Sequence, residues 1–318
     1  MKIALSLLIG ISLITACSYL PLAPRNSPAG LSAGSPTENS LTATPQPLGE
    51  GVAGKIDHDI TYCTMDNVDL KLDLYFPKNM NASAPIVVYV HGGAWMGGDK
   101  TSSAGEIDLP LIIDSFLNNG FIVGAVNYRL APQYKFPAMI EDVKCAIRFL
   151  RTNAESYDIN PDKIGAWGGS AGGQLVNLLG TTDASAGFDT GQYLDQSSRV
   201  EAIADLFGHS DLPAYFQEKK GHSALRKMVF GTFNLINASP DTYITPDDPP
   251  FLILHGDADQ SVPLDQSQGF YSKLTAVGVP AQLNIVHNGP HGLDAPDESP
   301  SPSQLAEIIV DFFIKYLK

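Results

Sequence analysis

Hydrophobic and polar positions along residues 55–318 follow two repeating patterns, which predict strands and helices in alternation. Short runs that are apolar at nearly every position suit strands buried on both faces of a sheet. These runs lie at 86–90, 121–126, 164–167, 202–207, 251–254 and 283–286. Between them, apolar residues recur at the spacing of a helix with one buried face. The helical segments are 109–118, 139–152, 171–179, 265–277 and 304–317.

Two segments before the first buried run alternate apolar and polar residues, as strands with one solvated face do. Residues 60–63 and 68–76 follow this pattern and predict an antiparallel hairpin at the edge of the sheet. Strands and helices that alternate along a chain pack as a mostly parallel sheet with helices on both faces. We therefore expect one α/β domain over residues 55–318, with ligands bound beyond the carboxyl ends of its strands.

The first 54 residues do not continue this pattern. Residues 1–16 hold a short apolar run after Lys2 and predict a signal peptide, since the run is too short to span a bilayer. The run ends in ITAC at Cys17, which resembles the lipobox of bacterial lipoproteins; the alternative is an ordinary secretory signal. Residues 17–54 are rich in Pro, Gly, Ser and Thr and predict a disordered, lipid-anchored linker.

These features predict an exported lipoprotein of the cell envelope, or otherwise a secreted or periplasmic protein. We expect membrane contact only through a lipid on Cys17. Export would permit a disulfide between Cys63 and Cys145, but the pattern leaves open whether they pair or remain two buried thiols. No cluster of Cys and His has the spacing of a metal site, so we expect neither a metal nor a cofactor.

The composition narrows the classes of partner. The chain has 34 acidic and 20 basic side chains, and its net charge is −14. An acidic surface excludes a nucleic-acid binder that relies on basic side chains. The 44% hydrophobic content excludes a wholly disordered chain. The charge is best interpreted as a feature that keeps the domain soluble.

A glycine-rich turn follows the strand expected at 164–167 and precedes the next helix. Residues 168–172 read GGSAG, which matches the G-x-S-x-G nucleophile turn in its required context. A serine in such a turn is lifted into the open, and the positions occupied by Gly168 and Gly172 must be small. The alternative is a phosphate cradle, but the Lys-Ser/Thr of a P-loop and the G-x-G-x-x-G pattern are missing here. Ser170 is therefore the predicted nucleophile.

Two further motifs accompany this turn in chain order. Residues 91–95 read HGGAW and resemble the HGGG-type loop of lipases and esterases, and residues 255–263 resemble the pattern H-G-x-x-D-x-x-V-P. In these motifs the chain resembles α/β-hydrolase carboxylesterases of the feruloyl/acetylxylan esterase-like (BD-FAE-type) and hormone-sensitive-lipase-like groups. The resemblance covers residues 60–318 and implies an α/β-hydrolase fold with a small cap insertion within residues 211–245.

The resemblance implies a Ser-His-Asp triad. In this fold the order along the chain is serine, acid, histidine, which assigns Asp259 as the acid and His291 as the base for Ser170. Asp257 and His287 remain the alternatives for these two roles.

The HGGAW loop implies further roles. Backbone N–H groups of Gly93 and Ala94, together with Ala171 at the helix start, are the expected oxyanion hole. Trp95 is expected to line the substrate pocket or simply to pack. His91 is expected to order the loop, and Arg129, in a family-like NYRLAP stretch, is either a scaffold contact or a substrate clamp.

The expected function is hydrolysis of carboxylic esters through an acyl-enzyme. The expected substrates are small-molecule esters with short acyl chains, or polysaccharides that carry acetyl or feruloyl esters. A serine peptidase of the prolyl-oligopeptidase type shares the order of the triad, but residues 55–318 leave no room for its propeller. A catalytically silent binding module is the alternative from another class, and the presence of all three triad residues speaks against it. No nucleic-acid partner is expected.

Overall fold

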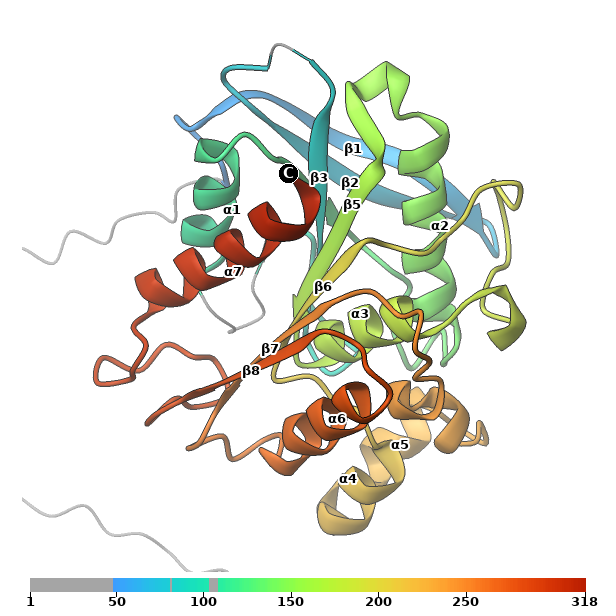
Figure 1. The fold of residues 1–318 in the computed structure, drawn as a ribbon. Coiled ribbons are helices and arrows are strands. Elements are labelled where there is room, and N and C mark those ends of the chain that lie inside the picture. The colour runs from blue at the N-terminus through green and yellow to red at the C-terminus, as the bar shows by residue number, and fades with distance from the viewer. Residues whose placement is uncertain (1–47, 81, 103–107) are drawn as a thin grey trace, which may run out of the picture. The chain divides into compact units, whose positions relative to one another are not determined.

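The computed structural model describes residues 48–80, 82–102 and 108–318 (Figure 1). The expected signal peptide, the lipidation site at Cys17 and most of the expected linker lie outside the described residues. Within the described ranges, no helix has both the length and the apolar character that crossing a bilayer requires.

One sheet of eight strands forms the centre of the domain, in the order β1-β2-β4-β3-β5-β6-β7-β8. The strands are β1 (Ala53–Met65), β2 (Val68–Pro77), β3 (Ala84–Val90), β4 (Ile122–Val126), β5 (Ile159–Gly169), β6 (Ala202–Leu206), β7 (Phe251–Gly256) and β8 (Ala281–Val286). β2 pairs antiparallel with β1 and β4, and all other neighbours are parallel. The predicted edge hairpin and the mostly parallel sheet are both confirmed.

Helices cover both faces of this twisted sheet (Figure 1). They are α1 (Leu109–Asn118), α2 (Ala138–Thr152), α3 (Ala171–Thr181), α4 (Leu212–Glu218), α5 (Ser223–Val229), α6 (Asp265–Ala276) and α7 (Pro302–Leu317). Helices α1 and α7 pack on one face, and α2, α3 and α6 on the other. The short helices α4 and α5 lie between β6 and β7 in sequence and form the small cap that the resemblance implied.

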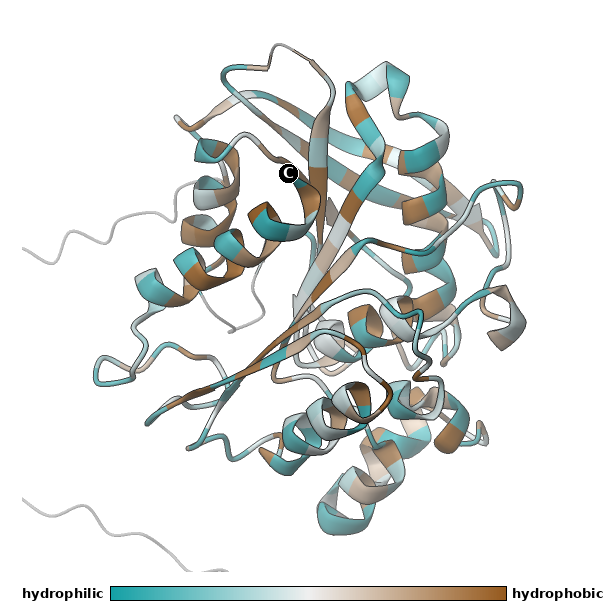
Figure 2. Ribbon diagram, viewed as in Figure 1, coloured by the Kyte–Doolittle hydropathy of each residue, from teal (hydrophilic) through white to brown (hydrophobic). Residues whose placement is uncertain are grey.

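Two apolar cores correspond to the two faces of the sheet. Phe116 of α1 and Phe313 of α7 belong to one core, and Ile147 of α2 and Leu175 of α3 belong to the other. In Figure 2, hydrophobic (brown) and hydrophilic (teal) segments alternate along helices such as α7, as expected for helices with one buried face. Full burial of such a side chain contributes about 1.5–3 kcal/mol. Burial on both sides of the sheet explains why the continuous apolar runs predicted its strands.

The ends of the flanking helices are set by their first residues. Asp108 accepts a hydrogen bond from the N–H of Leu111 at 3.0 Å, which caps α1. Ser301 and Gln304 form a reciprocal capping box at the start of α7, and Pro302 occupies the first helical turn. Both helices pack against the same face of the sheet through their apolar residues.

The folded domain begins before residue 55, so the expected boundary of the linker is too late. Leu48 is buried in the core that contains Tyr75 and Leu117, and β1 begins at Ala53. A single leucine in a stretch rich in proline and glycine has no periodicity, so the sequence pattern could not mark it as core.

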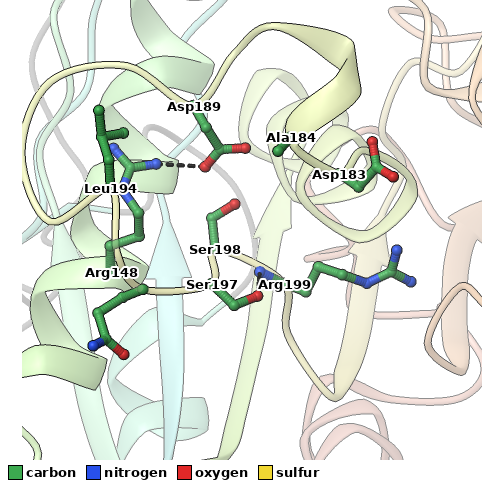
Figure 3. Close-up of a pocket in the computed structure, with 9 residues that line it drawn as sticks. Arg148, Asp183, Ala184, Asp189, Leu194, Ser197, Ser198 and Arg199 are labelled. Atoms are coloured by element: carbon green, nitrogen blue, oxygen red, sulfur yellow. Dashed lines mark hydrogen bonds and ion pairs between the residues drawn. The ribbon is translucent and has the colours of Figure 1, made fainter.

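Cys63 of β1 and Cys145 of α2 form a disulfide, with their Cα atoms 6.5 Å apart. This answers the question that the sequence left open. Two cations of α2 bind the loop beside the bridge. Lys144 lies 3.1 Å from the Asp189 carboxylate. Arg148 forms a second ion pair with the same carboxylate, which Figure 3 shows. Helix α2 therefore holds both an edge strand and a long loop in place.

The double variant Cys63→Ala/Cys145→Ala should be less stable than the wild type by about 2–4 kcal/mol, because the bridge limits the unfolded chain. Urea unfolding under non-reducing conditions, followed by circular dichroism, measures the difference. The reduced wild type serves as the control and should unfold near the variant. Equal midpoints for variant and oxidised wild type would contradict a stabilising bridge.

Candidate active site

Ser170 lies in a tight turn between β5 and α3. Its backbone angles are φ 55° and ψ −116°, a strained conformation for a residue with a side chain. The turn packs against the end of β3: a Cβ on Gly172 would lie 2.1 Å from the carbonyl oxygen of Val90, and one on Gly168 would lie 2.5 Å from it. Only glycine fits at these two positions, as the motif predicted on steric grounds.

Three loops bring the predicted serine, histidine and aspartate together. His291 lies on the loop after β8, and its Nε2 is 2.9 Å from Ser170 Oγ. The other ring nitrogen, Nδ1, lies 2.7 Å from Oδ2 of Asp259, which follows β7. The three side chains therefore form one continuous chain of hydrogen bonds at the carboxyl edge of the sheet.

The Asp259 side chain is fully buried, and its surroundings favour the ionised form. Oδ1 accepts hydrogen bonds from the backbone N–H groups of Ser261 and Val262 at 2.7 and 2.9 Å. Burial by itself would raise the pKa of Asp259, but hydrogen bonds from His255 and His291 outweigh it and hold the pKa well below the usual range. A carboxylate is therefore present to orient and stabilise the His291 ring.

The alternative acid and base pair with each other instead. His287 Nδ1 lies 3.0 Å from Oδ2 of Asp257, and this aspartate also accepts a hydrogen bond from the N–H of Asn288 at 2.7 Å. The His287 side chain is 75% exposed, and in the described structure neither residue is hydrogen-bonded to Ser170. The geometry therefore separates this surface pair from the Asp259–His291 pair.

The HGGAW loop adopts a strained turn beside the nucleophile. Gly93, Ala94 and Trp95 all have positive φ angles of 102°, 54° and 59°. The turn is closed by the N–H groups of Met96 and Gly97, which both donate to the carbonyl oxygen of Gly93 at 3.0 Å.

The backbone donors expected in the oxyanion hole lie on two turns, the HGGAW turn and the turn that carries Ser170. Gly93 and Ala94 line the same cavity as Ser170. Ala171 is the first residue of α3, where a helix leaves its N–H without an internal partner. Across the described ranges, no acceptor is hydrogen-bonded to the N–H of Gly93, Ala94 or Ala171.

His91 and Arg129 have structural positions. His91 is buried, donates from Nδ1 to the carbonyl oxygen of Gly92 at 2.8 Å, and stacks on Tyr128 at 4.2 Å. Burial lowers the pKa of His91 to about 4, so the ring is neutral near pH 7. Arg129 lies outside the cavity and binds Asp142 with Nη2 at 2.7 Å from Oδ1. Arg129 is thus a scaffold contact.

The nucleophile opens into a cavity of about 490 Å³ between the sheet edge and the cap. Its lining residues are Gly93, Ala94, Trp95, Met96, Ser170, His209, Tyr215, His222, Leu225, Ser261, Val262 and His291. Trp95 forms part of the wall and is also packed: Nε1 donates to Gln174 at 3.0 Å, and the ring centre lies 5.3 Å from that of Phe230. The two expected roles of Trp95 are therefore compatible.

Three polar aromatic residues of the wall were not predicted from the sequence. His209 is buried, with its ring 5.0 Å from Trp95 and 4.4 Å from Tyr215. Burial lowers the pKa of His209 to about 3, and the charge of the neighbouring His291 acts in the same direction. Tyr215 Oη lies 2.9 Å from Nδ1 of His222 in the cap.

His209 precedes Asp259 in the chain, so the order serine, acid, histidine excluded it as the catalytic base. Its position three residues after β6 was the signal that could have placed it at this edge.

The model of one protein family, BD-FAE, matches residues 72–274. The chain belongs to the BD-FAE family. Among curated relatives, a probable carboxylic ester hydrolase, LipM of Mycobacterium tuberculosis, is 32% identical over 231 residues, which are 70% of this chain and 52% of that protein. Esterase LipC of the same organism is 28% identical over 65% of this chain and 52% of its own length. The chain thus spans about half the length of these curated relatives.

Solved structures extend the comparison to the fold of this BD-FAE protein. A truncated carbohydrate esterase from gut microbiota superposes with a TM-score of 0.72 and 28% identity, over 85% of this chain and 99% of that one. A bifunctional GH43-CE protein of Bacteroides eggerthii gives a TM-score of 0.70 and 31% identity, over 83% of this chain and 38% of that one. The predicted α/β-hydrolase fold and the BD-FAE-type resemblance are confirmed.

Proposed function

We propose that this BD-FAE protein hydrolyses carboxylic esters through an acyl-enzyme formed on Ser170. The observation that carries the proposal is the continuous hydrogen-bond chain from buried Asp259 through His291 to Ser170, whose hydroxyl faces a cavity also lined by Gly93 and Ala94. The names of the relatives, carboxylic ester hydrolase and esterase, support the same chemistry.

The first half of the reaction acylates the serine. His291 Nε2 accepts the proton of Ser170 Oγ as this oxygen attacks the ester carbonyl carbon. The negative charge that develops on the carbonyl oxygen is stabilised by the N–H groups of Gly93, Ala94 and Ala171. Loss of one such donor typically raises the barrier by about 2.7–4 kcal/mol. His291 then protonates the departing alcohol, while Asp259 stabilises the imidazolium.

The second half repeats these steps with water. His291 accepts a proton from a water molecule, whose oxygen attacks the acyl carbon bound to Ser170 Oγ. The same backbone donors stabilise the second tetrahedral intermediate. Its collapse returns the proton to Ser170 and releases the carboxylic acid.

The cavity wall suits an uncharged ester group next to Ser170. Apart from its histidines, the described lining residues carry no ionisable charge at neutral pH, and Trp95, Tyr215 and Leu225 provide aromatic and apolar surface. We propose that the substrates are short-chain esters or acetyl and feruloyl esters attached to polysaccharides. The titles of two structural relatives, a carbohydrate esterase and a GH43-CE protein, favour the polysaccharide version.

A rate panel tests the substrate proposal. It compares p-nitrophenyl esters of increasing chain length with acetylated xylan and methyl ferulate, and a Ser170→Ala variant gives the blank for each. We expect p-nitrophenyl acetate to be cleaved faster than long-chain esters, and acetate or ferulate to be released from the natural esters. Turnover of p-nitrophenyl acetate with no detectable acetate or ferulate would overturn the polysaccharide version and leave ester hydrolysis standing.

We also propose that the catalytic domain is held at the cell envelope by a lipid on Cys17. The support is the ITAC sequence that precedes this cysteine and the composition of the following residues. Such an anchor would place the esterase where fragments of external polymers arrive.

A further inference from the structure

A second hollow of about 450 Å³ lies on the cap, outside the catalytic cavity. We call it the cap groove. Its principal lining residues are Phe216, Gln217, Arg226, Phe233, Asn234 and Ile236. Helices α4 and α5, which lie together at one end of the domain in Figure 1, contribute the first three of these.

Arg226 is the charged member of this lining and has no protein partner within the described residues. The other described arginines each form an ion pair with a carboxylate. They are Arg129, Arg148, Arg151 and Arg199. By contrast, neither a hydrogen bond nor an ion pair is present for the Arg226 side chain in the described structure, and the groove lining contains no carboxylate. The Arg226 side chain is exposed, so its guanidinium donors are available to a ligand in the groove.

The charge of the cap differs from that of the rest of the chain. Residues 211–245 hold four basic and three acidic side chains, whereas the whole chain holds 20 and 34. An anionic ligand would be repelled less by the cap than by the rest of this acidic chain. The cap is therefore the part of the chain where an acidic ligand meets the least repulsion.

The uncharged lining residues fit a sugar. Phe216 and Phe233 provide aromatic surface on which the apolar face of a pyranose ring can rest. Gln217 and Asn234 are exposed amides that can exchange hydrogen bonds with hydroxyl groups. The backbone N–H of Ile236 donates to Asn234 Oδ1 at 3.0 Å. This bond fixes the orientation of the amide and points its NH₂ group away from that backbone.

The cap groove and the catalytic cavity share a wall. Tyr215 and Leu225 line the catalytic cavity, and their chain neighbours Phe216 and Arg226 line the groove. The Tyr215 and Phe216 ring centres lie 5.0 Å apart. A linear polymer that occupies the groove can therefore pass over α4 and α5 toward Ser170.

We propose that the cap groove binds an acidic polysaccharide, with a uronic-acid carboxylate held by the Arg226 guanidinium while an ester on the same chain enters the catalytic cavity. A guanidinium can donate two parallel N–H···O bonds to one carboxylate, so Arg226 suits a uronic acid in both geometry and charge. The proposal rests on the proposed function, since it names the substrate class for the same active site.

The first experiment measures acetate release from acetylated glucuronoxylan, which is acidic, and from acetylated glucomannan, which is neutral. Arg226→Ala should lower kcat/KM for the acidic polymer by about tenfold, mainly through KM, because a charge-assisted pair is lost. Activity on glucomannan and on p-nitrophenyl acetate should not change. Arg226→Lys should give an intermediate value, since lysine keeps the charge but lacks the planar group that donates two parallel hydrogen bonds.

Lys227→Ala is the matched control. Lys227 is the next residue of α5, is exposed and carries the same charge, but it does not line the groove. We expect less than a twofold effect on either polymer. Equal losses in the Arg226 and Lys227 variants would show long-range attraction rather than a subsite and would overturn the proposal. Loss of activity on the neutral polymer as well would overturn the acidic class.

A binding measurement separates this proposal from the proposed function. In affinity electrophoresis through gels that contain deacetylated glucuronoxylan, wild type and Ser170→Ala should both be retarded, and Arg226→Ala should not. Retardation with no ester hydrolysis by the wild type would contradict the proposed function and leave the groove assignment intact. Absence of retardation in the wild type would overturn the groove assignment. Arg226-dependent binding to vesicles of anionic phospholipid, without binding to the glycan, would overturn it in favour of a membrane contact.

Discussion

Ser170→Ala is expected to lower kcat for p-nitrophenyl acetate by about 10⁵-fold or more, the scale seen when a triad nucleophile is removed. The variant removes Oγ, the atom that lies 2.9 Å from His291 Nε2. The turn itself should persist, because the backbone N–H of Ser170 still donates to the carbonyl oxygen of Leu206 at 2.9 Å. Steady-state rates measure the loss, and circular dichroism shows whether the fold is retained.

Ser261→Ala controls for a change in the same cavity. Ser261 also lines the cavity, but its contact with Asp259 is made by the backbone N–H, which the substitution keeps. Its activity should stay within about tenfold of the wild type.

Diethyl p-nitrophenyl phosphate should add a diethyl phosphoryl group to the peptide that contains Ser170, as detected by mass spectrometry. Labelling of a different serine, or full activity in Ser170→Ala, would refute the assignment.

Asp259→Asn is expected to reduce kcat by about 10⁴-fold, as found when a triad aspartate is made neutral. The Asp259 carboxylate accepts a hydrogen bond from His291 Nδ1 at 2.7 Å and holds Nε2 free to accept the serine proton. An amide can donate to Nδ1 instead, and it then stabilises the wrong tautomer of the ring. Because the side chain at this position is fully buried, bulk solvent cannot stabilise the imidazolium in place of the lost carboxylate.

Asp257→Asn is the matched control for this variant. The two aspartates lie in the same loop, and each contacts a histidine, but the Asp257–His287 pair is exposed and distinct from the triad. Activity should therefore remain within about twofold of the wild type. The reverse result, a large loss in Asp257→Asn with little change in Asp259→Asn, would reassign the acid.

The sequence predicted the strands and helices well because burial determines their pattern. Helix 109–118 is found with the predicted limits, and the edge hairpin follows the alternation of 60–63 and 68–76. Ser170 was predictable because its neighbours at positions 168 and 172 must be glycine for a local steric reason. Asp259 was predicted from the motif at residues 255–263, and His291 from the order of serine, acid and histidine along the chain.

Features that depend on distant segments were beyond the sequence pattern. The Cys63–Cys145 bridge requires α2 to pack over the outermost strand, and no local periodicity encodes that approach. The buried His209 and the contact between Tyr215 and His222 depend on how the cap folds back over the sheet edge. The cap groove has the same origin, since its lining comes from short helices joined by irregular turns.

The hydrogen bond between Ser170 and His291 joins residues that are 121 positions apart in the chain. It requires β6, β7 and β8 to be paired beside β5, because these strands bring the histidine loop to the serine. Parallel pairing of distant strands is slow, because the chain loses conformational entropy before the stabilising contacts form. In a refolding experiment, recovered esterase activity would therefore report the completed C-terminal half of the sheet, whereas the helix signal can return earlier from local contacts.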